Sequence, residues 1–356
     1  RETSQGADWP AAFSALPEIS AMSWVDLLLP PSEFRAEHTL GVGQLYHWKC
    51  VGESTWVGCP IDNIPVELEQ RSSTCAVRSL TGGQLPKGFL QKLRVYMNLT
   101  TGLPPLRELY TEWSRQSDAE LQADFEQWPG SRTLRQEPFE CLMSYIALQK
   151  NNVARATLML DRLRRAYGDK VASLPEGMMA QREVKLAEPK TKGKLAHIAE
   201  FNEDRGLYSF PTLERLAEVS EEELFELGFG YRSKYIAGAT AQLKEEGGYT
   251  VLEELRLADR QDAERQLRRY PGVGPKVAAA VALLALGFSN AISVDVHMQR
   301  VVTKFAPADL NRALASKKAL TARFHEEVGD VFRERFGPYA GLAQRALYAR
   351  EVARTP

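Results

Sequence analysis

The sequence predicts an α+β protein in which a twisted antiparallel β-sheet domain precedes an all-α domain. Short stretches rich in β-branched and aromatic residues, bounded by turn residues, occupy residues 23–100. From Leu106 onward the apolar residues recur every three or four positions instead. The chain has 356 residues, 44% of them hydrophobic, so it is long enough for about two domains with separate cores.

The change of period sets the expected domain boundaries. We expect a flexible segment over residues 1–22, the sheet domain with some helices over 23–135, and the helical domain over 136–356. Within the sheet domain, 54–57 and 74–80 have the composition of strands. In 92–99 apolar and polar residues alternate, which is the period of a half-buried strand.

Helical patterns follow one another through the rest of the chain. Residues 106–113 form one amphipathic repeat, and 137–165 contain two helices joined around residues 149–152. Ser220 and Glu223 have the spacing of a capping box and predict a helix start. The final pattern, 339–352, places Gln344 and Tyr348 four positions apart on one helical face.

Composition excludes several classes of protein. The net charge of −1 does not indicate a general nucleic-acid binder, so any such surface must be a local patch such as the basic stretch 150–170. The cysteines, Cys50, Cys59, Cys75 and Cys141, contain no close pair and do not predict a zinc site. Their scatter is typical of a reducing compartment. No apolar run reaches the length of a membrane span.

A glycine-rich hairpin, Tyr270-Pro-Gly-Val-Gly-Pro-Lys276, is the most informative stretch. Gly272 and Gly274 allow a tight turn with positive φ and close approach of bare backbone to a partner. Pro275 is suited to the first position of a helix. Residues 277–286 are apolar on every face and stop at Gly287, which predicts a buried helix. Lys276 therefore lies at a helix N-terminus, where N–H groups attract anions.

The chain after Gly287 can return a carboxylate to Lys276. A twelve-residue helix is about 18 Å long, and the next eight residues, if extended, span roughly 26 Å. Asp295 can thus lie beside Lys276 and serve as the N-cap of a helix that starts at Val296.

An amine beside a carboxylate suggests a nucleophile with an electrostatic partner. A lysine with the ordinary pKa of about 10.4 is protonated at neutral pH, so we expect burial and the two helix N-termini to favour the neutral amine of Lys276. The alternatives are a structural lysine that holds a phosphate and an aspartate that only caps its helix.

The motif Pro-Gly-Val-Gly-Pro-Lys276 followed by Val-Asp295-Val-His297 resembles the helix-hairpin-helix DNA glycosylase signature. A lysine at this place resembles the bifunctional members, above all the 8-oxoguanine DNA glycosylases of the eukaryotic type. The resemblance covers residues 24–348. It implies an N-terminal sheet domain, a helix-hairpin-helix catalytic domain, and removal of 8-oxoguanine opposite cytosine with associated lyase activity at abasic (AP) sites.

The resemblance implies the following roles around the reaction. Lys276 attacks C1′ of a flipped-out nucleoside and forms a Schiff base that permits β-elimination, while Asp295 stabilises the cationic sugar. The carbonyl of Gly43 accepts from N7–H of 8-oxoguanine, a proton that guanine lacks. Gln344 reads the base edge and Tyr348, where the family usually has Phe, stacks on it. The second wall is thinner than in the family, because Ala280 and Leu284 replace the usual Cys and Met.

The same resemblance assigns residues to the DNA surface. They are the hairpin and phosphate contacts Gly272, Gly274 and His297, and the opposite-strand group Lys150, Asn151, Asn152, Arg155, Tyr231 and Arg232. Tyr231 is expected to wedge beside the estranged base, and Arg155 and Arg232 to hydrogen-bond the cytosine. Lys150 stands where the family has Asn, so we expect an altered preference for cytosine.

No cofactor is expected, although the hairpin of this family binds a monovalent cation through backbone carbonyls, here those of Arg268, Tyr270 and Val273. An iron–sulfur cluster is not expected, because no cysteine follows Cys141. The charged stretch 176–205 has the pattern of a mobile surface insertion, or alternatively of an added DNA contact. The resemblance further implies a monomer that acts on double-stranded DNA away from membranes, in the nucleus or the mitochondrion.

Two other functions remain open from the sequence. An alkylpurine DNA glycosylase would share the fold but normally lacks the lysine. A non-catalytic helix-hairpin-helix DNA-binding protein would keep the glycines without needing Lys276 or Asp295.

Overall fold

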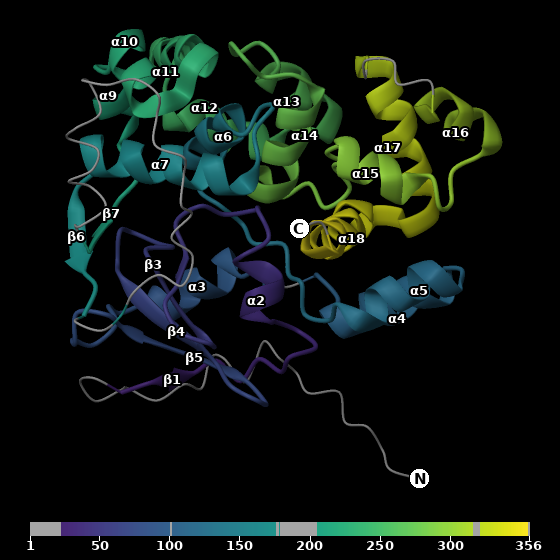
Figure 1. Cartoon of the computed structure of the whole chain (residues 1–356), viewed down its shortest axis with the longest axis horizontal. Coiled ribbons are helices and arrows are strands. Elements are labelled where there is room, and N and C mark those ends of the chain that lie inside the picture. The colour runs from purple at the N-terminus through teal and green to yellow at the C-terminus, as the bar shows by residue number, and fades with distance from the viewer. Residues whose placement is uncertain (1–22, 100–101, 176–177, 179–204, 316–320, 355–356) are drawn as a thin grey trace.

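The computed structural model describes residues 23–99, 102–175, 178, 205–315 and 321–354. It has a sheet region and a helical region that lie against each other (Figure 1). The expected flexible segment 1–22 and nearly all of the insertion 176–205 lie outside the described residues. In the described part of the chain no helix is long and apolar enough to cross a bilayer.

The N-terminal sheet has five antiparallel strands in the order β1-β5-β4-β3-β2, as the predicted fold class requires. Its strands, with the two helices beside them, are β1 Val25–Asp26, α2 Ala36–Thr39, β2 Lys49–Cys50, β3 Thr55–Gly58, β4 Val66–Gln70, β5 Cys75–Ser79 and α3 Phe89–Tyr96. Strand β4 was not predicted, although Val66-Glu-Leu68-Glu has the alternation of a half-buried strand. Glu67 is nevertheless buried, since its carboxylate lies 2.6 Å from the guanidinium of Arg78 on β5.

The strand predicted over 92–99 is wrong, because this stretch forms helix α3. Phe89, Leu93, Tyr96 and Met97 are buried at helical spacing, while Val95 is 42% exposed. A stretch of eight residues with frequent apolar residues fits both the strand period and the helix period. Packing of Phe89, Leu93, Tyr96 and Met97 against the sheet core selects the helix.

The helical region follows in chain order. Its helices are α4 Leu106–Arg115, α5 Ala119–Gln127, α6 Pro138–Ala147, α7 Val153–Tyr167, α9 Leu213–Leu216, α10 Glu221–Leu224, α11 Ser233–Glu246, α12 Tyr249–Glu254, α13 Arg260–Leu267, α14 Pro275–Val281, α15 Val296–Val302, α16 Ala308–Ala315, α17 Ala322–Phe336 and α18 Ala340–Arg354. The sequence patterns predict α4, α6, α7, α10, α14, α15 and α18. A small hairpin, β6 Lys170–Ser173 with β7 Gly206–Tyr208, flanks the insertion. The capping box of Ser220 and Glu223 is present.

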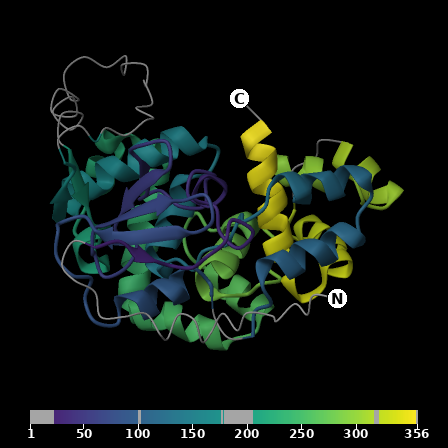
Figure 2. The ribbon, with the colours of Figure 1, turned by 90° about the horizontal axis from the view of Figure 1, so that it is seen from below.

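Two hydrophobic cores correspond to the two regions. Helices α4 and α5 precede α6 in the chain but belong to the helical core, where the rings of Trp113 and Phe125 contact Phe336 of α17. They lie beside α18 in both orientations (Figures 1 and 2). Helix α18 thus packs against α5, α15, α17 and α2, and it contacts both regions.

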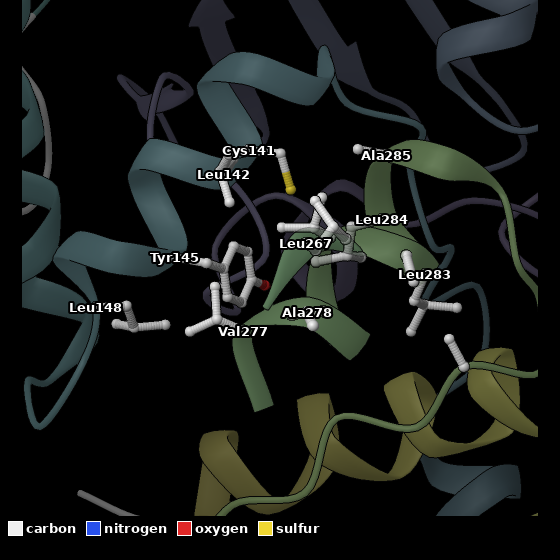
Figure 3. Packing of buried hydrophobic residues seen from close by; sticks show 14 of the residues in the cluster. Cys141, Leu142, Tyr145, Leu148, Leu267, Val277, Ala278, Leu283, Leu284 and Ala285 are labelled. Atoms are coloured by element: carbon white, nitrogen blue, oxygen red, sulfur yellow. The ribbon is translucent and has the colours of Figure 1, made fainter. Parts of the chain in front are cut away.

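Helix α14 is buried as predicted. Every side chain from Val277 to Leu286 is at most 7% exposed, and Figure 3 shows α6 packing on α14 through Tyr145 and Val277. The last turn, Ala282–Leu286, widens to a π-helix and ends at Gly287, whose φ of 94° needs a glycine.

Candidate active site

Lys276 and Asp295 meet at the N-termini of two helices. Gly274 is the N-cap of α14, Pro275 takes its first position, and Lys276 follows in the first turn. After Gly287 the chain returns, and Asp295 caps α15. The Nζ atom of Lys276 lies 3.4 Å from Oδ2 of Asp295. The predicted pairing is confirmed, but the Lys276 side chain is 39% exposed and so less buried than expected.

Asp295 is held so that one oxygen faces the amine. Its Oδ1 accepts from the backbone N–H groups of His297, at 3.0 Å, and Met298, at 3.1 Å. These bonds fix the direction of the carboxylate and leave Oδ2 toward Lys276. The Oγ of Ser293 donates to the carbonyl of Lys276 over 3.0 Å, which ties the returning segment to the start of α14.

One pocket brings together residues that lie far apart in the sequence. It is lined by all the predicted catalytic and base-binding residues: Lys276, Asp295, Gly43, Gln344, Tyr348, Ala280 and Leu284. It is also lined by residues that the sequence analysis missed: Tyr145, Leu148, Leu283, Ser293 and Arg345. Figure 3 shows Tyr145 on α6 and Leu148 just past its end, with Leu283 and Leu284 in the turn that follows α14. Of these missed residues, only Arg345 could have been found from the sequence, because it lies one helical turn before Tyr348.

Gly43 is required at its position by space and by conformation. Its φ is 73°, and a Cβ there would lie 2.7 Å from Cγ2 of Val153. The hydroxyl of Tyr46 donates to the Gly43 carbonyl over a long 3.4 Å. A glycine is therefore needed to bring bare backbone to the pocket wall.

The amide of Gln344 is oriented by the backbone of Ser293, in the segment that returns from α14 to α15. Its Oε1 accepts from Ser293 N–H at 3.2 Å, and its Nε2 donates to the Ser293 carbonyl at 2.7 Å. One N–H and one lone pair of the amide remain available to a ligand after these bonds.

Tyr348 forms an aromatic wall between two polar groups. His297 meets its ring edge-on at 5.8 Å, and the guanidinium of Arg345 lies 4.7 Å from the ring centroid. Burial, with a further contribution from the negative charge of Asp295, raises the pKa of Tyr348 to about 12, so the phenol is neutral at physiological pH. The Nδ1 of His297 is buried and has no hydrogen-bond partner among the described residues.

The predicted opposite-strand residues and the hairpin gather around the turn between α6 and α7, whereas His297 lies apart on α15. Gln149 in this turn donates from Nε2 to the carbonyl of Gly272 in the hairpin, at 2.7 Å. The carbonyl of Gln149 accepts from the hydroxyl of Tyr231, at 3.1 Å, and from the guanidinium of Arg232. The hairpin, the α6–α7 turn and the segment 231–232 therefore form one continuous surface.

The residues of this surface differ in exposure and in their hydrogen bonds to the protein. Tyr231 is 45% exposed, whereas Arg232 is buried and donates to the backbone carbonyls of Gln149, Lys150 and Phe229. Asn152 caps α7 through the N–H of Arg155. Asn151 donates from Nδ2 to the Ala147 carbonyl and to Met159 Sδ, while Lys150 and Arg155 are exposed.

The two hairpin glycines have different roles. Gly272 has a φ of 79°, and a Cβ would lie 2.7 Å from Cβ of Tyr235, as a tight turn requires. The expectation of positive φ at Gly274 is wrong: its φ is −91°, and a Cβ there would meet no atom within 4 Å. As an N-cap, Gly274 has extended backbone, which any residue can adopt.

No metal cluster is evident at the site. Within the described ranges, no group of three or more His, Cys, Asp or Glu side chains could hold a metal ion. The described cysteines are free thiols. Of the three carbonyls expected to bind a monovalent cation, that of Tyr270 accepts from the N–H of Val273 at 3.1 Å; the cation site stays a prediction.

Comparison with known proteins identifies the family. Residues 143–328, more than half of the chain, match the model of the HhH-GPD superfamily of base excision DNA repair proteins. The chain belongs to this superfamily. Residues 26–142 match the N-terminal domain of 8-oxoguanine DNA glycosylase. The recognition made from the hairpin motif is therefore confirmed.

Relatives and solved structures agree with this assignment. The chain is 33% identical to "N-glycosylase/DNA lyase OGG1" of Arabidopsis thaliana over 96% of its own length and 84% of that protein. It is 30% identical to "N-glycosylase/DNA lyase" of Saccharomyces cerevisiae over 64% of its own length and 58% of that protein.

One bacterial and one archaeal structure share the fold. The Clostridium acetobutylicum 8-oxoguanine glycosylase/lyase, in complex with dsDNA containing cytosine opposite to 8-oxoG, superposes with a TM-score of 0.71 at 21% identity and covers 94% of this chain and 96% of its own. The 3-methyladenine DNA-glycosylase of Archaeoglobus fulgidus gives 0.62 at 20% identity, covering 93% and 98%. Because glycosylases named for different bases share this fold, the preferred base must be argued from the pocket.

Proposed function

We propose that the protein is a bifunctional DNA glycosylase and AP lyase that removes 8-oxoguanine paired with cytosine. The single observation that carries this proposal is the amine of Lys276, 3.4 Å from the Asp295 carboxylate, at a pocket lined by Gly43, Gln344 and Tyr348. A monofunctional enzyme would not need the amine, and a DNA-binding module would need neither group. The names of the Arabidopsis and yeast relatives, N-glycosylase/DNA lyase, support the same two activities.

The chemistry follows from the position of the amine. The neutral Nζ of Lys276 attacks C1′ of the extruded nucleoside, the N-glycosidic bond breaks, and the base leaves with the bonding electrons and takes up a proton. The resulting aminal opens the sugar ring to a Schiff base between Nζ and C1′. Loss of a C2′ proton then expels the 3′ phosphate. Asp295, whose direction is fixed by its cap bonds, stabilises the positive charge on the sugar.

Recognition of the base depends on the two pocket walls. N7–H of 8-oxoguanine donates to the Gly43 carbonyl, and guanine would instead place an acceptor against an acceptor. An unmatched buried pair of this kind costs about 1–3 kcal/mol. The remaining N–H and lone pair of Gln344 can read the Watson–Crick edge, while Tyr348 stacks on the ring.

The surface formed by the hairpin, the α6–α7 turn and segment 231–232 is proposed to hold the duplex. Exposed Tyr231 is suited to fill the space that base extrusion leaves. Exposed Arg155 can donate to cytosine, whereas Arg232 first has to exchange its bonds to the Gln149 and Lys150 carbonyls. The named relative crystallised with dsDNA containing cytosine opposite 8-oxoG supports this partner.

The proposed reaction uses side chains alone and requires no cofactor. A monomeric enzyme, a structural monovalent cation at the hairpin, and a nuclear or mitochondrial location stay predictions of the family resemblance.

Borohydride trapping tests the proposal. A duplex with one 8-oxoguanine opposite cytosine is incubated with the protein and borohydride, and a covalent protein–DNA adduct is expected. Lys276→Gln should abolish it, because the amine forms the Schiff base. Lys244→Gln, which removes an exposed lysine of α11, is the matched control and should leave the adduct intact. Base release without an adduct would favour a monofunctional alkylpurine-type enzyme, and no base release would leave only a DNA-binding protein.

A further inference from the structure

Arg345 is an unusual residue to find in this pocket. Its side chain is 5% exposed, and it lines the pocket beside Gln344 and Tyr348. Of the other buried arginines, Arg132 and Arg164 each pair with a glutamate, and Arg232 donates to three backbone carbonyls. Within the described part of the chain no carboxylate lies at ion-pair distance from Arg345. A buried charge without a partner costs several kcal/mol, so its retention at a binding site suggests a role there.

The few contacts of Arg345 join the two walls of the pocket. Its Nη2 donates to the carbonyl of Val42, at 2.7 Å, immediately before Gly43 and 303 positions away in the sequence. Its guanidinium lies over the Tyr348 ring. The buried Nε–H has no hydrogen-bond partner among the described residues. A donor is therefore left over after the structural contacts are satisfied.

Arg345 also sets the charge of the pocket. With Lys276 as the neutral amine that attacks C1′, the charged side chains that line the pocket are Arg345 and Asp295, whose charges cancel. Without Arg345 the carboxylate of Asp295 would leave a net charge of −1, which would favour a cationic base. In a water-poor pocket such a charge acts strongly on a ligand, because the effective dielectric constant is low.

We propose that Arg345 is a specificity residue whose buried guanidinium favours neutral oxidised purines that carry carbonyl acceptors and disfavours cationic alkylated purines. An 8-oxopurine offers carbonyl oxygens to a cationic donor. A 7-methylated guanine carries a positive charge on its imidazole ring and is repelled. This inference rests on the proposed function and names the substrate class that its pocket selects.

The test compares base release from two duplexes with strand cleavage at an abasic site, each measured under single-turnover conditions. The duplexes carry 8-oxoguanine or 7-methylguanine opposite cytosine. The abasic substrate has no base, so its cleavage reports the folded state and the Lys276 chemistry apart from the pocket charge. Arg345→Gln removes the charge and keeps a donor for the Val42 carbonyl, and Arg345→Lys keeps the charge.

For Arg345→Gln we expect 8-oxoguanine release to fall roughly ten-fold relative to abasic-site cleavage, as loss of a charge-assisted bond predicts. The ratio of 7-methylguanine to 8-oxoguanine release should rise by a similar factor. Arg345→Lys should retain the wild-type ratio. Arg350→Gln is the control on the same helix: Arg350 lies over Trp128, outside the pocket, and the ratio should not change.

The outcomes separate this inference from the proposed function. Unchanged ratios in Arg345→Gln, or equal shifts in the Gln and Lys variants, would overturn the role of the charge. A wild-type protein that forms no adduct and releases no 8-oxoguanine would overturn the proposed function before any variant is made. If Arg345→Gln fails to fold, it will not cleave abasic sites. Arg345→Met then replaces it, because methionine fills the volume of the arginine stem without the charge. The ratio of 7-methylguanine to 8-oxoguanine release has to rise in Arg345→Met as expected for Arg345→Gln.

Discussion

At the scale of single residues, Lys150 has a conformation that its side chain does not favour. Its φ is 46°, in the left-handed region, and its side chain is exposed. Its carbonyl is held by Arg232 at 3.1 Å, so the turn is fixed from the backbone. Asparagine, which the family has here, visits this region more readily than lysine does.

Lys150→Asn should therefore change both specificity and stability. Replacing the long cation is expected to sharpen discrimination against adenine opposite the lesion, measured as the ratio of excision rates for duplexes with cytosine and adenine. Relief of the left-handed strain should raise the free energy of unfolding by about 0.5 kcal/mol. Lys150→Ala removes the same charge without the preference for the left-handed region and serves as control. Unchanged excision ratios in both variants would remove the proposed influence of this side chain.

Prediction of single residues from the sequence succeeded where a short stretch of chain limits how far apart two residues can lie. Lys276 and Asp295 are joined by one helix and one extended segment, so their pairing could be derived from the lengths of the two. Arg345 was missed although it lies one helical turn before Tyr348, and its contact with Val42, 303 positions away, has no local signal. Gly43 and Gln344 were found only through family resemblance, for the same reason.

At the scale of elements, the extended segment that returns from the end of α14 to α15 is held by its neighbours. Nε2 of His325 on α17 accepts from the N–H of Val294 at 3.1 Å, one residue before Asp295. This bond requires a neutral imidazole. Burial lowers the pKa of His325 to about 4, with Arg333, Arg268 and Arg260 acting in the same direction and Glu326 opposing them.

His325 should make stability depend on pH in the acid range. Between pH 6.5 and about 4 the unfolded chain binds a proton at His325 that the folded protein does not bind, so stability falls as the pH falls through this window. The slope is at most about 1.4 kcal/mol per pH unit. His325→Gln keeps an acceptor near Val294 but cannot titrate, and its free energy of unfolding should fall less steeply between pH 6.5 and 4.

Chemical unfolding at several pH values measures this difference. The other histidines titrate in both proteins and cancel when the variant is subtracted from the wild type. Parallel curves for the two proteins would mean that His325 contributes no linkage, and the buried imidazole would then have to be protonated or solvent-accessible in the folded state.

Element-level prediction failed where a segment was too short for its period to decide. Helix α3 has only eight residues, and its apolar positions fit a strand until the 89/93/96/97 face packs on the sheet. Strand β4 was missed although its residues alternate, and the burial of Glu67 could not be predicted because its partner Arg78 lies on another strand. Long helices such as α7 and α18 contain enough turns for their period to be recognised.

At the scale of the whole molecule, the pocket exists only because two regions are joined. Gly43 comes from the N-terminal region, while the other lining residues come from α6 and its C-cap, the α14–α15 segment and α18. Nearby, a charged group crosses the same boundary. Arg164 of α7 bonds to Glu140 of α6 at 2.5 Å and to the carbonyl of Tyr46 at 3.2 Å, and His47 contacts Glu140 at 3.2 Å.

Glu140 is therefore expected to stabilise the junction of the two regions. Burial alone would raise the pKa of this carboxyl, but the positive charge of Arg164 and the contact with His47 lower it to about 2. Its contribution to stability is therefore present above pH 4.5 and is lost as the pH falls toward 2. Glu140→Gln leaves the guanidinium of Arg164 buried without a carboxylate.

Glu140→Gln should lower the free energy of unfolding at pH 7 by roughly 3 kcal/mol, because one partner of a buried pair is removed. Urea unfolding measures the loss. Glu112→Gln, which breaks the exposed pair with Arg115, is the matched control and should cost less than about 1 kcal/mol. Equal losses in the two variants would show that the charges at this boundary do not hold the regions together, and that apolar packing alone keeps Gly43 against the helical pocket.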